Sequence, residues 1–274
     1  MNYPKISVIT PSYNQAQFLE RTIKSIIEQD YPNLEYIVCD GGSNDGSVEI
    51  IKKYKDKITW WCSEKDKGQS DAINKGFKRA TGDIVCWINS DDVLLKGALM
   101  EYARMYNENP ECSVYMAQTM RIDDNDNILY FHILPKPYPF LYKNGIIYVP
   151  QQSWAWKRDI FDQIGYINIE RHACMDIDYI LRQLRAGYKF AYSRKTIGAI
   201  RVYEGTKSSM EDLNDENNIW YKDLKVMTKE YADFKLCKAT PLDVLLYRLF
   251  KLFNGIYIKQ YILTRIYKGK KYYQ

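Results

Sequence analysis

The sequence predicts an α/β fold in which helices cover a mostly parallel sheet. Apolar runs typical of strands occupy residues 5–10, 34–40, 58–64 and 83–89, and helix-like segments separate them. Such an alternation of strands and helices favours parallel strands. At 274 residues and 46% hydrophobic content, the chain can bury a sizeable core. The first intervening segment has its apolar positions on one helical face: Phe18, Leu19, Thr22, Ile23, Ile26 and Ile27.

After the fourth strand, the pattern predicts a helix at about 97–109 and then a hairpin around the turn 123–127. This acidic turn lacks the glycine and the distal glutamate of a calcium loop, so we expect a solvated turn. A helix is expected at 175–187. A strand pair within 189–203 and a polar helix from about 209 to 234 should follow.

Polar clusters follow each of the four predicted parallel strands. They are TPSYNQ after the first strand, DGGSNDGS after the second, SEKDKGQSD after the third and NSDD after the fourth. Because ligands of such sheets bind outside the carboxyl ends of the strands, we expect these four loops to converge on one binding rim.

The charge is unevenly distributed along the chain. The net charge is +5, and residues 235–274 hold nine lysines or arginines against one acid, which leaves −3 for residues 1–234. A negative main body with no broad basic face argues against nucleic-acid binding. The tail mixes basic, aromatic and apolar residues, so it suits either an anionic membrane surface or packing against the domain or a second subunit.

The cysteines and the amino terminus bear on the cellular compartment. The amino terminus reads as a strand without a basic and apolar leader, and no apolar run reaches the length of a membrane span. Reduced thiols in a cytoplasmic protein are expected, with peripheral contact at the inner face of the cell membrane as an option of the tail. No metal-binding spacing relates the six cysteines, at positions 39, 62, 86, 112, 174 and 237.

Four segments in order resemble family 2 glycosyltransferases of the GT-A fold: ISVITPSYNQAQFLERTIKSIIEQDYPNLEYIVCDGGSNDGS, SEKDKGQSDAINKGFKRATGDIVCWINSDD, QQSWAWKRDIFDQIGYI and MDIDYILRQLRAG. The resemblance implies transfer of a sugar from a nucleotide diphosphate to an acceptor hydroxyl with inversion. It implies a catalytic domain at 1–205, with a nucleotide-sugar part at about 1–95 and an acceptor part at about 96–205. Residues 206–274 would form a basic helical extension.

The acids of NSDD end an apolar strand, where adjacent carboxylates repel unless water or a cation compensates them. Where the family usually has Asp-x-Asp, this chain has Asn89, Ser90, Asp91 and Asp92. The resemblance therefore implies that Asp91 binds Mg²⁺ or Mn²⁺, supported by Asp92, and that Ser90 contacts the nucleotide sugar. A solvated acidic turn is the alternative.

The resemblance also implies a nucleotide site made by the first two loops. Pro11, Ser12 and Tyr13 would hold the base, on which Tyr13 can stack, and Asp40 would accept a ring N–H. Without the family, Asp40 is only a turn residue.

In the third loop, Lys67 is expected near the phosphates and Asp71 near the ribose or sugar. Ser70 or Asp71 can equally cap the helix that follows.

For the acceptor side, the resemblance implies that Asp176 is the general base. The alternative is a helix cap. Asp178 matches a helix-packing position of the family. Gln152, Trp154 and Trp156 are candidates for acceptor contact, although the tryptophans suit burial equally.

One departure from the family concerns the position of a histidine that contacts metal or phosphate. Tyr203 stands there, so metal affinity can be weaker unless Glu204 or Lys207 substitutes.

We therefore expect an inverting, metal-assisted glycosyltransferase that uses a UDP-sugar and builds bacterial surface polysaccharide on a glycan or lipid-linked glycan. The alternative is a nucleotide-sugar-binding scaffold with little or no turnover, and a homo-oligomer is an option in either case. A dinucleotide oxidoreductase is disfavoured because the first loop lacks the glycine triplet.

Overall fold

A computed structural model describes residues 2–136, 138–145, 148–204, 206, 218–234, 236 and 240–273. Within them, nine strands form one sheet in the order β3-β2-β1-β4-β8-β6-β9-β5, and β7 pairs with β6. The strands are β1 (Ile6–Ser12), β2 (Leu34–Asp40), β3 (Trp60–Ser63), β4 (Ile84–Trp87), β5 (Val93–Leu94), β6 (Val114–Ile122), β7 (Ile128–His132), β8 (Trp154–Lys157) and β9 (Phe190–Arg201).

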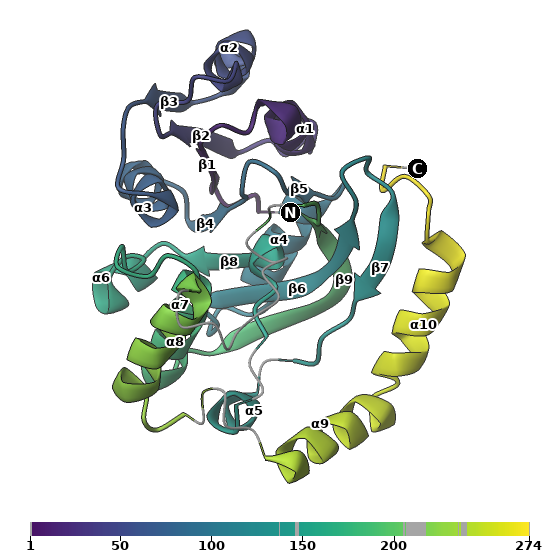
Figure 1. The fold of residues 1–274 in the computed structure, drawn as a ribbon. Coiled ribbons are helices and arrows are strands. Elements are labelled where there is room, and N and C mark those ends of the chain that lie inside the picture. Colours follow the sequence, from purple (N-terminus) through teal and green to yellow (C-terminus); the bar gives the residue numbers. More distant parts are fainter. Residues whose placement is uncertain are drawn as a thin grey trace.

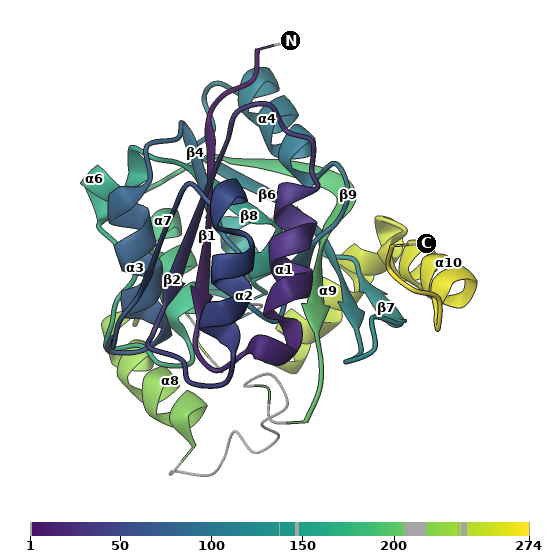
Figure 2. The same ribbon diagram turned by 90° about the horizontal axis from the view of Figure 1, so that it is seen from above.

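Helices cover both faces of this sheet (Figures 1 and 2). The α-helices are α1 (Ala16–Ile27), α2 (Ser47–Lys53), α3 (Gln69–Arg79), α4 (Ala98–Glu108), α5 (Pro139–Lys143), α6 (Ile160–Ile164), α7 (Met175–Arg185), α8 (Ile219–Glu230), α9 (Pro241–Phe253) and α10 (Ile256–Tyr267). Two 3₁₀ turns, η1 (Lys55–Lys57) and η2 (Gln151–Ser153), complete the set.

The four predicted parallel strands are confirmed, because β1 pairs in parallel with β2 and β4, and β2 with β3. Alternate residues of these strands enter two separate cores. Val8 packs in the core shared with α1, α2 and α4, whereas Ile9 packs in the core shared with α3, α6, α7 and α8. Burial on both faces explains why the strands read as continuous apolar runs.

The second half of the sheet is mixed, and the sequence predicted it only partly. The hairpin of β6 and β7 is confirmed. The strand pair expected within 189–203 is wrong, because β9 runs as one strand from Phe190 to Arg201 and pairs with both β6 and β5. The expected solvated turn at 123–127 is partly wrong, since Asp126 is buried and pairs with Arg201 at 2.7 Å.

The carboxyl-terminal helices lie at the outer edge of the sheet. Figure 1 shows α10 alongside β7 and α9 below it. Thr240 caps α9 in a reciprocal pair with Asp243, with Pro241 in the first turn. The polar helix predicted at 209–234 is confirmed in α8, but residues 207–217 and Lys207 lie outside the described part. No helix among the described residues combines the length and the apolar character needed to cross a bilayer.

Candidate active site

A cavity of about 670 Å³ opens at the carboxyl ends of β1, β2 and β4. All four polar loops predicted to converge on this rim contribute to its wall, together with the end of β9. Its described lining residues are Pro11, Ser12, Tyr13, Gln15, Gly41, Gly42, Lys65, Asp66, Gly68, Gln69, Ala72, Asn89, Ser90, Asp91, Asp92, Gln152, Ile200, Arg201, Tyr203 and Thr206. This volume is within the range of ligand sites for small molecules.

The carboxylate of Asp40 fixes the loop after β2 through hydrogen bonds. It is 1% exposed and accepts hydrogen bonds from the backbone of Gly42 and Ser43 at 3.0 and 2.9 Å and from Ser63 Oγ at 2.7 Å. Gly41 and Gly42 line the cavity, and Asp40 is not among its described lining residues. Asp40 thus supports this loop, and its contact with a nucleobase stays a prediction. A Cβ at Gly41 would lie 2.7 Å from Asp66 Oδ2, so a larger residue there would displace the Asp66 carboxylate from its place on the cavity wall.

Asp92 is the buried member of the acidic pair after β4. It is 3% exposed and accepts hydrogen bonds from Gln152 Nε2 at 2.7 Å, Arg201 N at 2.9 Å and Asn89 Nδ2 at 3.1 Å. Burial, and then the charge of Asp91, raise the pKa of Asp92 to about 7. Because protein donors already occupy both of its oxygens, Asp92 supports the loop from behind and is poorly placed to hold a cation directly.

Arg201 connects this acidic loop to the rest of the fold. The guanidinium is buried, donates from Nε to the Asp91 carbonyl at 2.9 Å and from Nη1 to the Asp123 carbonyl at 2.9 Å. It also lies 4.8 Å from the centre of the Phe18 ring, close enough for a cation–π contact. The loop is thus fixed by a positive charge that comes from the far end of β9.

Asp91 is half-buried on the cavity wall and is the carboxylate best placed for a cation. Its Oδ2 accepts the Tyr203 hydroxyl at 3.0 Å. The side-chain oxygen Oδ1 of Asn89 already accepts a hydrogen bond from Gln69 Nε2 at 2.8 Å. No group of three metal-binding side chains occurs among the described residues. One carboxylate still fits a hard cation such as Mg²⁺, which keeps several waters and shares phosphate oxygens.

The loop before α3 differs in detail from the prediction. Lys65 and Asp66 line the cavity, whereas Lys67 and Asp71 are not among its described lining residues. Asp71 Oδ2 instead accepts the backbone N–H of Lys67 at 3.1 Å and so holds the turn that precedes α3. Thus Lys65, two residues earlier than predicted, brings the positive charge to the cavity.

The three acceptor candidates separate into one cavity residue and two core residues. Gln152 lines the cavity and donates to Asp92. Trp154 and Trp156 are both 0% exposed, and their rings pack against each other at 6.0 Å between centroids. Fully buried rings have no face to offer a sugar, so the tryptophan contacts are wrong and the burial alternative holds.

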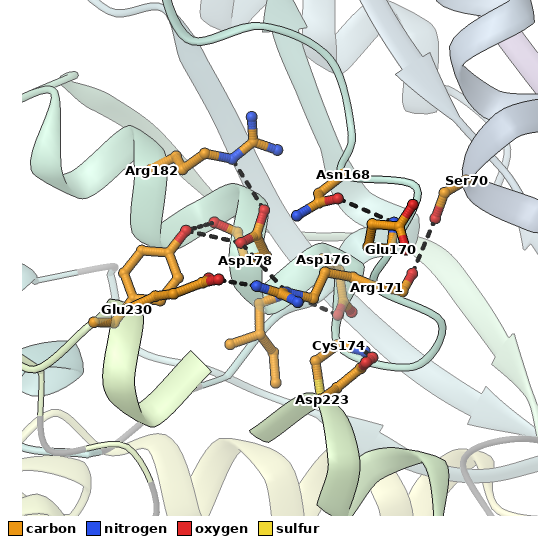
Figure 3. Close-up of polar contacts among 12 residues, drawn as sticks. Ser70, Asn168, Glu170, Arg171, Cys174, Asp176, Asp178, Arg182, Asp223 and Glu230 are labelled. Carbon is orange, nitrogen blue, oxygen red and sulfur yellow. Dashed lines mark hydrogen bonds and ion pairs between the residues drawn. The ribbon is translucent and has the colours of Figure 1, made fainter. Parts of the chain in front are cut away.

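Asp176 lies in the first turn of α7, which Figure 3 shows with its neighbours. The carboxylate is half-buried, and its Oδ1 accepts the backbone N–H of Ile177 at 2.8 Å. It is not among the described residues that line the cavity. Just before it, the backbone N–H groups of Ala173 and Cys174 donate to Asp223 Oδ2 of α8 at 2.7 and 3.0 Å. The position of Asp176 is therefore held by its own backbone and by α8.

Asp178 serves a different purpose from Asp176, two residues earlier. It is 2% exposed, lies 3.0 Å from Arg182 Nε and accepts the Tyr231 hydroxyl at 2.8 Å. Arg171 Nε is 3.9 Å away, and Arg171 also pairs with Glu230 (Figure 3). Asp178 is thus enclosed by cations and helix-packing groups, as the family pattern implied.

Helix α3 connects the cavity to the segment that precedes Asp176. The Ser70 hydroxyl contacts the Arg171 carbonyl at 3.2 Å (Figure 3). It also contacts Met175 Sδ at 3.0 Å. Asn74 donates to the Ile167 carbonyl at 2.7 Å and accepts the Ile167 N–H at 3.0 Å. Because the same helix begins at the cavity wall with Gln69, the two regions belong to one packed unit.

A model of the protein family described as "Glycosyl transferase family 2" matches residues 7–165 of this chain. The chain belongs to this family. This glycosyltransferase is 26% identical over 280 residues to an uncharacterised glycosyltransferase of Rickettsia typhi, across 98% of this chain and 86% of the relative. It is 38% identical over 109 residues to the GalNAc(5)-diNAcBac-PP-undecaprenol beta-1,3-glucosyltransferase of Campylobacter jejuni, across 38% of this chain and 35% of that one.

Solved structures show that the glycosyltransferase has the GT-A fold. The crystal structure of S. aureus TarS 1–349 in complex with UDP-GlcNAc matches with a TM-score of 0.65 and 20% identity, over 86% of this chain and 68% of that chain. The mannosyltransferase PcManGT from Pyrobaculum calidifontis, in complex with GDP-Man and Mn²⁺, matches with a TM-score of 0.58 and 20% identity, over 76% and 60%.

Sequence reasoning did not identify several residues of the cavity wall. Gln15, Gln69 and Thr206 carry no pattern that distinguishes them from other surface residues. Arg201 did carry a signal, because a charged residue inside the apolar strand β9 is costly unless it is paired. An arginine at this position therefore predicts carboxylate partners close by.

Proposed function

We infer that this glycosyltransferase transfers a sugar from a nucleotide diphosphate, with UDP as the proposed nucleotide, to an acceptor hydroxyl with inversion. The observation that carries the inference is the carboxylate Asp91 on the wall of a cavity that the loops after β1 and β2 also form. The complex of TarS with UDP-GlcNAc supports UDP as the first nucleotide to test.

In this proposal, the base and ribose lie against Pro11, Ser12 and Tyr13, and the diphosphate lies near Ser90, Asp91 and Lys65. Tyr13 is 62% exposed, so its ring is available for stacking on a base. Asp91 would hold Mg²⁺ or Mn²⁺, with Asp92 fixing the loop. When bound, the cation neutralises charge on the leaving diphosphate.

Asp176 is the proposed general base. Its carboxylate takes the proton of the acceptor hydroxyl while the oxygen attacks the anomeric carbon and the bond to the diphosphate breaks. Attack from the face opposite the leaving group gives inversion. The contacts of Ser70 and Asn74 support this role, because they join the segment before Asp176 to the helix that begins at the cavity.

For the acceptor we propose a glycan or lipid-linked glycan of bacterial surface polysaccharide. The relative from Campylobacter jejuni carries an undecaprenol-linked acceptor in its name, and a Bacillus subtilis relative, 37% identical over 99 residues, is named as a putative teichuronic acid biosynthesis glycosyltransferase. We propose a cytoplasmic location with peripheral membrane contact through the extension 206–274, which would follow a catalytic domain at 1–205.

A thermal-shift screen tests the proposal. UDP, dTDP and GDP are each added with and without Mn²⁺, and the expected result is metal-dependent stabilisation by one nucleotide. Asp91→Asn should abolish the metal dependence, whereas Asp124→Asn, in the exposed turn after β6, serves as a control of equal charge change. Lack of stabilisation by any nucleotide would contradict the site.

The scaffold alternative predicts a different outcome. It rests on Asn89 and Tyr203, which replace an acid and a histidine of the family pattern. A scaffold would show nucleotide stabilisation but no transfer and no hydrolysis of any sugar nucleotide. Turnover that disappears in Asp176→Asn, with nucleotide stabilisation unchanged, would exclude it.

A further inference from the structure

Helix α9 presents its leucines to solvent instead of to the protein. The stripe residues follow the 3 and 4 spacing of one helical face, and each is between 39 and 83% exposed: Leu242, Leu245, Leu246, Leu249, Leu252 and Phe253. The opposite face packs inward, where Tyr247 stacks on Tyr148 at 6.4 Å and Phe250 contacts Tyr138 at 5.7 Å. An apolar stripe of this size on the outer face of a helix indicates an interaction surface.

Helix α10 continues the same arrangement after the turn at Gly255. Its inner face packs on β7 through Ile256 and Leu263, and Thr264 Oγ1 accepts the Phe131 N–H at 3.1 Å. Its outer face exposes Ile258, Tyr261, Ile262 and Ile266, each between 48 and 61% exposed. Thus both helices are anchored on one side and apolar on the other. We call these two outer faces the leucine surface.

The surroundings of the leucine surface are strongly basic. Residues 240–273 contain seven lysines or arginines and one acid, which leaves a net charge of +6. A cavity of about 180 Å³ lies at the junction of α9 and α10, and Lys136, Arg194 and Lys259 line it. None of its described lining residues is acidic. The cavity lies on the inner side of the junction, where Phe250 and Ile256 also line it. Basic pockets between helices of membrane proteins bind lipid headgroups.

Lys259 is the most enclosed of the three basic residues. It is half-buried, and its Nζ donates to the Arg194 carbonyl at 3.1 Å. Burial, and then the charge of Arg194, lower the pKa of Lys259. Two positive charges therefore lie close together in a cavity whose described lining residues include no acid. An anion in the cavity would offset their repulsion.

We propose that the leucine surface binds an anionic phospholipid bilayer, with a lipid phosphate in the cavity lined by Lys136, Arg194 and Lys259. The apolar stripe would enter the boundary between headgroups and acyl chains, as interfacial helices do. A second copy of the chain is the disfavoured occupant, because it would bring another +6 surface against this one. This inference rests on the membrane contact that is part of the proposed function. Vesicle binding tests it separately, because the measurement needs no transfer reaction.

The test is flotation of the full chain with vesicles of phosphatidylcholine alone and of phosphatidylcholine mixed with phosphatidylglycerol. Binding is expected only to the anionic vesicles and should weaken as salt rises. Lys136→Glu with Lys259→Glu should weaken it about 25-fold or more, since losing the two lysine charges lowers binding about fivefold each and the new carboxylates are repelled by the anionic surface. Leu252→Ser with Phe253→Ser should weaken it about tenfold.

The matched control is Lys55→Glu with Lys57→Glu, which makes the same change in net charge on the exposed η1 turn at the far edge of the sheet. If the control pair and the cavity pair weaken vesicle binding equally, the proposal of a lipid phosphate in the cavity is overturned. Absence of vesicle binding, together with a dimer in light scattering that Leu252→Ser and Phe253→Ser dissociate, would overturn the bilayer in favour of a second copy. Unchanged thermal unfolding and nucleotide stabilisation in each variant separate these outcomes from misfolding and from failure of the proposed function.

Discussion

Asp176 and Asp178 lie two residues apart in the first turn of α7, and the same substitution should have opposite effects at the two positions. Asp176 is half-buried, and its Oδ1 accepts the backbone N–H of the neighbouring Ile177, a bond that asparagine can keep. Asp176→Asn should therefore change the free energy of unfolding by no more than about 0.5 kcal/mol. Loss of the base should lower the transfer rate about 10²- to 10⁴-fold.

Asp178→Asn removes a buried charge that Arg182 contacts at 3.0 Å and Arg171 approaches to 3.9 Å. Breaking a buried pair by removing one partner costs about 3–5 kcal/mol. Arg171 keeps Glu230, and asparagine keeps one acceptor oxygen, so we expect the lower end, about 3 kcal/mol. For a chain of this size, that loss lowers the unfolding temperature by roughly 6–12 °C.

The assay combines thermal unfolding with single-turnover transfer, measured well below the unfolding temperature of both variants. The expected pattern is a stable and inactive Asp176→Asn beside a destabilised Asp178→Asn that still transfers sugar. An active Asp176→Asn would refute the assignment of the base. A stable but inactive Asp178→Asn would move the role of the base to Asp178.

Three further changes have outcomes that the structure fixes. A Cβ at Gly76 would lie 2.4 Å from Ile9 Cγ2, so Gly76→Ala should lower the free energy of unfolding by about 1–2 kcal/mol despite the better helix propensity of alanine. Adding Ile9→Ala should cost less than the sum of the single changes in urea unfolding; additivity would contradict the clash. Burial lowers the pKa of His132 to about 4, so stability should fall by about 3 kcal/mol as pH drops from 6.5 to 4, where the unfolded chain binds the proton more tightly. His132→Asn should remove this part of the dependence of the free energy of unfolding on pH. An unchanged dependence would contradict the prediction. Tyr203→Phe removes the hydroxyl that donates to Asp91 Oδ2 and should tighten Mn²⁺ binding about fivefold in a titration followed by thermal shift; weaker binding would show that the hydroxyl helps to hold the cation.

The elements that sequence reasoning predicted well are those with a local cause. The apolar stripe of α1, the buried runs of β1, β2 and β4 and the hairpin of β6 and β7 each follow from a repeat within ten residues or so. The convergence of four polar loops followed from one topological rule about parallel strands. In each case, the prediction needed no knowledge of which distant residue would be the neighbour.

The errors concern side chains whose role depends on a distant partner. Trp154 and Trp156 looked equally suited to a surface, and only the placement of β8 between β4 and β6 buries them. The sequence also did not show that Asp40 shapes its own loop, since Ser63, from the next strand, donates to its carboxylate. Sequence patterns give the chemical type of a side chain, while tertiary packing decides which of its atoms remain available.

The geometry of the proposed reaction depends on α3 more than on any loop. The helix begins at the cavity with Gln69, and Ser70 and Asn74, one turn apart, hold the segment 167–175 that leads into Asp176. Its far side packs on the sheet at Gly76, which leaves room for the Ile9 side chain of β1. A shift of α3 would therefore move the cavity wall and the base segment together, which preserves their separation. We therefore expect the loops around the cavity to tolerate sequence changes while α3 keeps its contacts with the sheet and with segment 167–175. Catalysis depends on the relative placement of the reacting groups, which these contacts hold.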